Sequence, residues 1–391
     1  MSELLPYGRQ SIAEEDVDAV VAALRDALIT QGPRVEQFER AIAESVGARH
    51  AVAFANGTAA LHGAAAAAGL GAGDEMLTTP ISFAASANCA LFVGARPRFA
   101  DIDPVTGNLD LPAAREAGLL GRVKACVAVS LAGLPIDLAP LQEARRAGLV
   151  VVEDAAHALG AIRDGRPVGG GAAAADMTVF SFHPVKAITS GEGGMVTTDD
   201  DALADTLRRF RTHGIQRAQP TADPMLGGWH YAIGSLGFNY RITDIQCALG
   251  ISQLHRLERF IAGRNDIADR YHEVLADARD LVLPARAPRN GRHAYHLFVV
   301  RFPEGAGRRR MVYDALRADG IGAQLHYIPI PAHGLYRDLG YAMSGLPQAQ
   351  AYWEQALSLP MFPGMGPGDV DRVVAVLRAA MQLPVSYPQR Q

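Results

Sequence analysis

The chain has 391 residues, 49% of them hydrophobic, which is enough for two domains and a large buried core. Its formal net charge of -4 and its sequence pI near 6.3 argue against binding to nucleic acid or to an anionic membrane. Cys89, Cys126 and Cys247 show no metal-ligand spacing and no pairing pattern, so we expect a reduced cytoplasmic protein without a metal site. The N-terminus lacks a signal-peptide pattern, and the apolar run at residues 59–70 is too short to span a bilayer.

The first predicted element is a helix that follows a possible capping box. Ser11 and Glu14 have the spacing of such a box. Five apolar residues then recur at helical spacing, namely Val17, Val20, Val21, Leu24 and Leu28. The sequence therefore predicts a helix with one apolar face, ended by the turn at residues 30–33, and a second helix over residues 35–46.

A strand is predicted over residues 50–54, and the alanine-rich helix after it begins at Gly57 and Thr58. The free backbone N–H groups and the positive dipole end of such a helix together bind phosphate. Taken alone, the sequence Asn-Gly-Thr is equally typical of any capped helix.

Further along, apolar strands alternate with helices, which indicates a mostly parallel sheet covered on both faces. One of these strands, at residues 149–152, is followed by Asp154 and His157. Ligands bind at the carboxyl ends of strands in such sheets, so Asp154 is a candidate site residue, although it could also cap a helix.

A lysine stands between two apolar runs in the middle of the chain. The first run, residues 177–182, predicts a buried strand, and a second short strand follows Gly193 and Gly194. Lys186 lies in the turn between them, with Ser181 at the strand end. A lone lysine is usually a surface residue, but a partly desolvated one becomes an amine nucleophile towards carbonyl carbon.

The motif Ser-Phe-His-x-x-Lys, followed by Gly-Glu-Gly-Gly, resembles the DegT/DnrJ/EryC1/StrS sugar aminotransferases of the fold type I pyridoxal-phosphate (PLP) enzymes. The resemblance continues in order along nearly the whole chain. Because the chain keeps the lysine that dehydratase variants of the family replace by histidine, transamination is favoured. The amino-acid sequences at residues 78–83, 181–186 and 325–330 most resemble those of the pseudaminic-acid branch of the family.

The resemblance implies roles for particular residues. Lys186 and Asp154 are the implied catalytic residues, the first binding PLP covalently and the second holding its ring nitrogen. The implied cofactor-binding residues are Gly57, Thr58, Phe83, Asp154, His157, Ser181, Lys186 and Asn239. The implied substrate-binding residues are Thr30, Tyr240, His326 and Tyr327. Asn239 is expected to reach the cofactor phosphate of a neighbouring subunit, and His157 could equally be a packed core histidine.

We therefore expect an α/β fold type I aminotransferase. A large cofactor-binding domain would span residues 1–250 and a smaller α/β domain residues 251–391, and the N-terminal segment could pack on the smaller domain. The expected protein is a cytoplasmic homodimer with shared active sites, without nucleic-acid or membrane partners.

The expected reaction is amination of C4 in a UDP-linked 4-keto-6-deoxy-HexNAc. Glutamate is the expected donor and leaves as 2-oxoglutarate, and pyridoxamine phosphate forms during turnover. Two alternatives stay open: a different keto-sugar or a cyclitol in antibiotic or surface-glycan biosynthesis, and a non-catalytic PLP-binding regulator. The acidic charge of the chain counts against the regulator.

Overall fold

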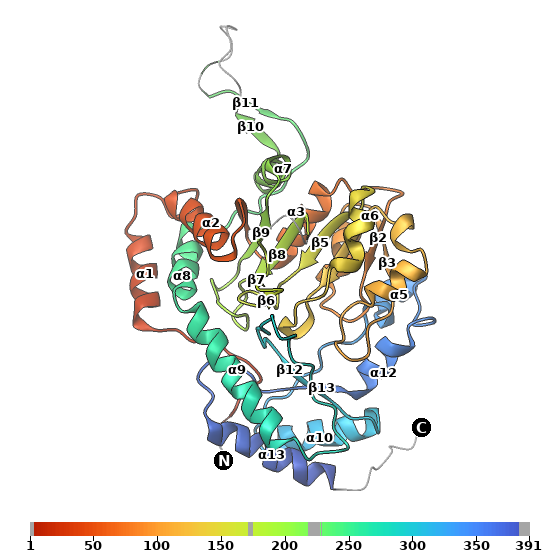
Figure 1. Cartoon of the computed structure of the whole chain (residues 1–391). Coiled ribbons are helices and arrows are strands. Elements are labelled where there is room, and N and C mark those ends of the chain that lie inside the picture. The colour runs from red at the N-terminus through yellow and green to blue at the C-terminus, as the bar shows by residue number, and fades with distance from the viewer. Residues whose placement is uncertain (1–3, 171–174, 218–226, 228, 383–391) are drawn as a thin grey trace.

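A computed structural model describes residues 4–170, 175–217, 227 and 229–382 (Figure 1). The α-helices are α1 Glu14–Leu24, α2 Pro33–Val46, α3 Gly57–Ala67, α4 Ala85–Phe92, α5 Leu111–Glu116, α6 Gln142–Arg146, α7 Asp201–Arg211, α8 Asp244–Leu254, α9 Leu257–Val274, α10 Ala306–Ala318, α11 Gly334–Asp338, α12 Pro347–Gln355 and α13 Pro367–Met381. The strands are β1 His50–Phe54, β2 Glu75–Thr78, β3 Arg96–Phe99, β4 Ala125–Val129, β5 Val150–Asp154, β6 Ile162–Arg163, β7 Arg166–Pro167, β8 Met177–Ser181, β9 Gly194–Thr198, β10 Ile215–Arg217, β11 Tyr231–Ile233, β12 Phe298–Arg301 and β13 Ala356–Leu359.

The central sheet has seven strands within the described residues, in the order β1-β9-β8-β5-β4-β2-β3. Strands β8, β5, β4, β2 and β3 pair in parallel, and β9 runs antiparallel to its neighbours β1 and β8. Helices α3, α4 and α7 pack on one face, and α2 and the start of α9 pack on the other. This mostly parallel sheet between helices confirms the predicted α/β class.

The inner strands of the central sheet are largely apolar because both of their faces are buried. In β1, Val52 and Phe54 belong to the core beneath α3, whereas Ala51 and Ala53 belong to the core beneath α2. Successive side chains of a strand point to opposite faces, so a strand that is covered on both sides has no solvent-exposed face.

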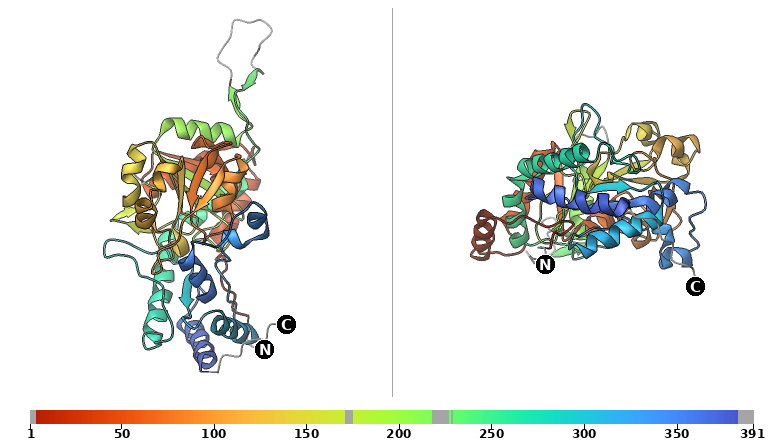
Figure 2. Two further views of the ribbon diagram at one scale, coloured as in Figure 1. Left: turned by 90° about the vertical axis from the view of Figure 1, so that its right-hand side faces the viewer. Right: turned by 90° about the horizontal axis from the view of Figure 1, so that it is seen from below.

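The C-terminal part of the chain forms its own core below the central sheet (Figures 1 and 2). Helix α9 connects the two regions, and α10 and α13 pack around the antiparallel pair β12–β13. Strand β12 begins only at Phe298, because Tyr295 has a positive φ of 43° and the N–H groups of residues 294 and 297 bond instead to the carbonyls of Gly133 and Ala132. The chain between 294 and 297 is thereby held against the loop that follows β4.

Helix α1 differs from its prediction in two ways. It begins at Glu14 with Ala13 as N-cap, and the Asp16 carboxylate accepts the Ala13 N–H at 2.9 Å, so the capping box predicted at Ser11 and Glu14 is wrong. The apolar stripe also faces outward: Val17, Val21, Leu24 and Leu28 are all exposed. The helix instead packs on α8 through a face that buries Asp16, which accepts hydrogen bonds from Ser252, Gln253 and Arg256.

The antiparallel pair β10–β11 extends away from the body at the end opposite α13 (Figure 2). Tyr231, Ile233 and Leu236 of this segment are exposed. In the part of the chain that the structure describes, no helix is both long enough and apolar enough to cross a bilayer.

Candidate active site

A cavity of about 710 Å³ opens at the carboxyl ends of the parallel strands, where open α/β sheets bind ligands. Its lining comes from the first turn of α3, from the ends of β5 and β8, and from the C-terminal segments that carry His296, His326 and Tyr327. Most of the predicted cofactor residues therefore meet in one place, although they come from distant parts of the sequence.

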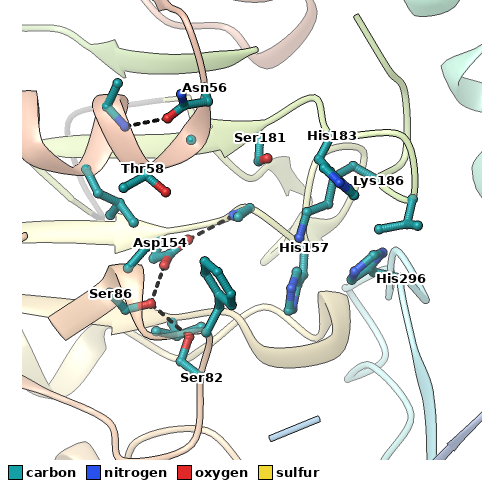
Figure 3. Close-up of a pocket in the computed structure, with 18 of the residues that line it drawn as sticks. Asn56, Thr58, Ser82, Ser86, Asp154, His157, Ser181, His183, Lys186 and His296 are labelled. Carbon is teal, nitrogen blue, oxygen red and sulfur yellow. Dashed lines mark hydrogen bonds between the residues drawn. The ribbon is translucent and has the colours of Figure 1, made fainter. Parts of the chain in front are cut away.

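One end of the cavity is built around the N-terminus of α3. Asn56 caps the helix, because its Oδ1 accepts the N–H of Ala59 at 2.8 Å (Figure 3). Gly57 lies so close to Ser181 that a Cβ at residue 57 would sit 3.0 Å from the Ser181 Cβ. Gly57, Thr58 and Ser181 all line the cavity, and the free N–H groups and dipole of an 11-residue helix make this end suitable for a phosphate.

Lys186 lies in the loop between β8 and β9. Phe182 is fully buried and closes this loop, because its carbonyl accepts hydrogen bonds from the Ser190 N–H and the Thr189 hydroxyl, both at 3.0 Å. Burial lowers the pKa of Lys186 to about 8, and the nearby Asp154 carboxylate opposes this shift. About a tenth of this amine is therefore neutral, and so nucleophilic, at pH 7, far more than for an ordinary lysine.

Asp154 is the last residue of β5 and is 4% exposed. Its carboxylate accepts the Ser86 hydroxyl at 2.6 Å and the Ala156 N–H at 3.1 Å (Figure 3). Burial raises the pKa of Asp154, while these two hydrogen bonds and the charge of Lys186 lower it. The chain after Asp154 forms turns without a helix, so the helix-cap alternative is wrong.

Three histidines surround the opposite end of the cavity. The Nε2 atom of His157 lies 3.2 Å from the Tyr327 hydroxyl, and its ring centroid lies 4.3 Å from that of His296. His326 Nδ1 lies 2.8 Å from the Ser358 hydroxyl. Burial, reinforced by the charge of Lys186, lowers the pKa of all three, to about 4 for His326. Neutral imidazoles therefore stand beside the amine, and His157 is both packed and part of the lining.

The aromatic residues form the mouth of the cavity. Phe83 is 61% exposed, and its ring centroid lies 6.4 Å from that of Tyr327. Tyr240 forms part of the wall near α3. Two predicted site residues, Thr30 and Asn239, are exposed and lie outside the lining of this cavity.

Several lining residues were not among the predicted site residues. Ser86, in the first turn of α4, donates to Asp154, and its hydroxyl lies 2.8 Å from that of Ser82. The spacing of four between these two serines was the available signal. Asn56 had the signal of an N-cap. His183 belongs to the motif Ser-Phe-His-x-x-Lys, which gave it a local signal, and it lines the cavity near Lys186 (Figure 3). His296 had no local signal, because its neighbour His157 comes from another part of the chain.

The lining fits pyridoxal phosphate. A phosphate suits the cradle at Gly57, an aldehyde suits the amine of Lys186, and a protonated ring nitrogen suits the carboxylate of Asp154. Among the described residues, no group of three or more His, Cys, Asp or Glu side chains could hold a metal ion.

Comparison with known proteins agrees with this chemistry. The family model of the DegT/DnrJ/EryC1/StrS aminotransferases matches residues 10–378. Spore coat polysaccharide biosynthesis protein SpsC of Bacillus subtilis is 39% identical over 382 residues, which cover 96% of this chain and 97% of that protein.

Solved structures of sugar-modifying and related enzymes have the same fold. PseC of Helicobacter pylori, an aminotransferase involved in the biosynthesis of pseudoaminic acid, matches with a TM-score of 0.89 at 30% identity, covering 97% of this chain and 100% of that one. The PMP form of Spr1654 from Streptococcus pneumoniae matches with a TM-score of 0.89 at 28% identity, covering 97% and 99%. The chain belongs to the DegT/DnrJ/EryC1/StrS aminotransferase family and is a PLP-dependent aminotransferase of fold type I.

Proposed function

We propose that this sugar aminotransferase aminates C4 of a UDP-linked 4-keto-6-deoxy-HexNAc, with glutamate as the amino donor. The observation that carries the proposal is one cavity that joins a phosphate cradle, an amine with a pKa of about 8 and a buried carboxylate. The likeness to PseC and SpsC supports a sugar of a surface glycan as the substrate.

In this proposal, the residues around α3 hold the cofactor phosphate. The N–H groups at Gly57 and Thr58 and the hydroxyl of Ser181 donate hydrogen bonds to it, and the exposed ring of Phe83 covers the pyridine ring. When bound, PLP supplies the electron sink that amino-group transfer requires.

Asp154 and Lys186 act on the reacting part of the cofactor. A carboxylate about 4 Å from a protonated ring nitrogen attracts it by roughly 4 kcal/mol at an effective dielectric constant of 20, which keeps that nitrogen protonated. This cation also favours the ionised form of Asp154 and so offsets the effect of burial on its pKa. The Nζ atom of Lys186 binds the cofactor covalently and, once free, moves a proton during the transfer.

Substrate contacts are proposed on the side of the cavity formed by the C-terminal segment. Tyr327 lies beside Phe83 with its hydroxyl next to His157, and His326 is held by Ser358. Tyr240 adds to the wall near α3. Thr30, which is exposed at the bridge to Thr243, would meet a long substrate such as a nucleotide-linked sugar outside the cavity.

We further propose a homodimer in which Asn239 serves the cofactor phosphate of the neighbouring subunit. Asn239 is exposed, and it lies outside the cavity of its own chain. Large exposed apolar surfaces mark sites of protein contact, and the described residues include exposed apolar side chains on and just after α1 and along the extended β10–β11 segment. The exposed residues are Val17, Val21, Leu24, Leu28, Tyr231, Ile233 and Leu236.

The test is a panel of nucleotide-linked keto-sugars incubated with PLP-loaded enzyme and glutamate, with mass detection of the products. We expect the UDP-linked 4-keto-6-deoxy-HexNAc to gain an amino group fastest. Faster amination of another keto-sugar or of a cyclitol would show that the proposed substrate is wrong, while the assignment as an aminotransferase would stand. A loaded protein that aminates nothing and never forms pyridoxamine phosphate with any donor would favour the regulator.

A further inference from the structure

A histidine outside the cavity lies at the centre of an aromatic cluster. His62 is on α3, one turn after the phosphate cradle, and is 5% exposed. Its ring centroid lies 5.1 Å from that of Phe92, 4.9 Å from those of Phe210 and Phe238, and 5.8 Å from that of Tyr240. The α3 residues around it are alanines, Leu61 and Gly63, so His62 is a polar exception in the middle of this helix.

One polar contact crosses the cluster. His62 Nδ1 lies 3.2 Å from the hydroxyl oxygen of Tyr240. Burial lowers the pKa of His62 and raises the pKa of Tyr240, so both groups are neutral at neutral pH and the contact is a hydrogen bond between neutral partners. This hydrogen bond restrains the orientation of the Tyr240 ring as well as contributing to stability, because it holds the hydroxyl at the far end of the ring.

Tyr240 ends a short extended segment, residues 238–240, whose backbone is bonded to two other parts of the chain. Phe238 and Tyr240 donate their N–H groups to the carbonyls of Phe210 and Arg211, and the Tyr240 carbonyl accepts the N–H of Ala55. In an extended segment, side chains alternate between the two sides. Phe238 and Tyr240 point into the cluster, and Asn239 between them is exposed.

We propose that His62 is a positioning residue for the neighbouring subunit. Its hydrogen bond to Tyr240 fixes the position and orientation of the segment 238–240. This sets the direction in which the Asn239 side chain projects from the molecule. The inference rests on the proposed shared site, in which Asn239 serves the cofactor phosphate of the other subunit. The loss of PLP affinity in a His62 variant then arises in its partner's site, although His62 also bonds to Tyr240, which lines the cavity of its own chain.

The first experiment measures cofactor affinity rather than turnover. PLP is titrated into the apo-protein of three variants: His62→Leu, Tyr240→Phe and the double variant. At each concentration, borohydride fixes the bound cofactor on Lys186, and the amount of labelled protein is measured. We expect each single variant to bind PLP about 3- to 10-fold more weakly, the range that one neutral hydrogen bond accounts for. The double variant should bind no more weakly than the single ones, because the two changes break the same bond. Wild-type affinity in both single variants would overturn the proposal.

The second experiment asks which subunit's site is affected. A tagged His62→Leu chain is coexpressed with a differently tagged Lys186→Ala chain, and the mixed dimer is purified on both tags. Its only Lys186 lies in the His62→Leu chain, and the proposed partner of that site is an Asn239 supported by an intact His62. We expect wild-type PLP affinity in the mixed dimer. Affinity as weak as in the His62→Leu homodimer would place the effect within one chain and overturn the proposal.

Two controls keep the outcomes distinct. Phe210→Leu removes a ring from the same cluster and keeps the polar contact, so we expect a lower melting temperature with unchanged PLP affinity. An equal loss of affinity in this variant would show that packing alone matters, and would overturn the proposal. If His62→Leu does not fold, His62→Phe, which keeps a ring and removes the polar contact, takes its place in the mixed dimer.

A third control separates this inference from the shared site on which it rests. Asn239→Asp replaces His62→Leu in the same mixed dimer with Lys186→Ala. Wild-type affinity supports the shared site, so a failure of His62→Leu would then concern His62 alone. Weak affinity with Asn239→Asp would overturn the shared site and the role of His62 together. Wild-type protein that fixes no cofactor on Lys186 would overturn the proposed function itself.

Discussion

Asp154→Asn isolates the charge of the residue proposed to hold the cofactor's ring nitrogen. The substitution keeps the size of the side chain, and its Oδ1 can still accept the Ala156 N–H that lies at 3.1 Å. The amide can also donate to the Ser86 oxygen, which now donates to the carboxylate at 2.6 Å. We therefore expect the variant to fold and to fix PLP on Lys186.

The expected effect follows from the charge that is lost. An attraction of about 4 kcal/mol at an effective dielectric constant of 20 corresponds to about three pKa units of the ring nitrogen, at about 1.36 kcal/mol per unit. Without it, the ring nitrogen is largely unprotonated at neutral pH. If the whole of this energy appears in the barrier, amino transfer slows by roughly a factor of a thousand.

The assay is a single turnover of loaded enzyme with glutamate, followed by the absorbance change to the pyridoxamine form. Glu153→Gln is a matched control, because Glu153 is equally buried on β5 but bonds to Ser130 and Arg163, outside the cavity. This control should lower the melting temperature and keep the rate per loaded site. A near-normal rate in Asp154→Asn would show that another group supports the ring.

Three further predictions concern the other cofactor residues. Borohydride should fix PLP on the Lys186 peptide, and the rate of loading should rise with pH through about 8 as the amine loses its proton; label on another lysine would contradict the assignment. Coexpressed Lys186→Ala and Asn239→Asp chains should regain about a quarter of wild-type activity, since half of randomly mixed dimers are mixed and each has one intact site; confirmed mixed dimers as inactive as the parents would refute sharing. Gly57→Ala should weaken PLP binding because its Cβ would crowd Ser181, whereas Gly71→Ala, which meets nothing within 4 Å, should not; equal affinities would refute the cradle.

Local sequence patterns predicted the parts of the site that depend on neighbouring residues. The strand over residues 50–54, the helix start at Gly57 and the strand end at Asp154 agree with the structure, because periodicity and turn residues act over a few positions.

Contacts between distant residues could not be predicted in this way. The pattern of α1 shows which residues share a face, but not which face meets α8, and that choice depends on Asp16 pairing with Arg256 far along the chain. The bond from Ser86 to Asp154 and the ring contact of His157 with His296 also join separate elements. Such pairs are fixed by tertiary packing, so no window of the sequence contains their signal.

The path of the first residues has a consequence for synthesis. Leu5 is buried and bonds to the backbone of Gly320 and Gly322, and the carbonyl of Tyr7, which lines the cavity, accepts the N–H of Met361. The ribosome makes these first residues long before their partners, and at about 5–20 residues per second the wait is on the order of tens of seconds. Residues 5–7 therefore dock late, and the wall that Tyr7 forms closes only after Met361 has been made.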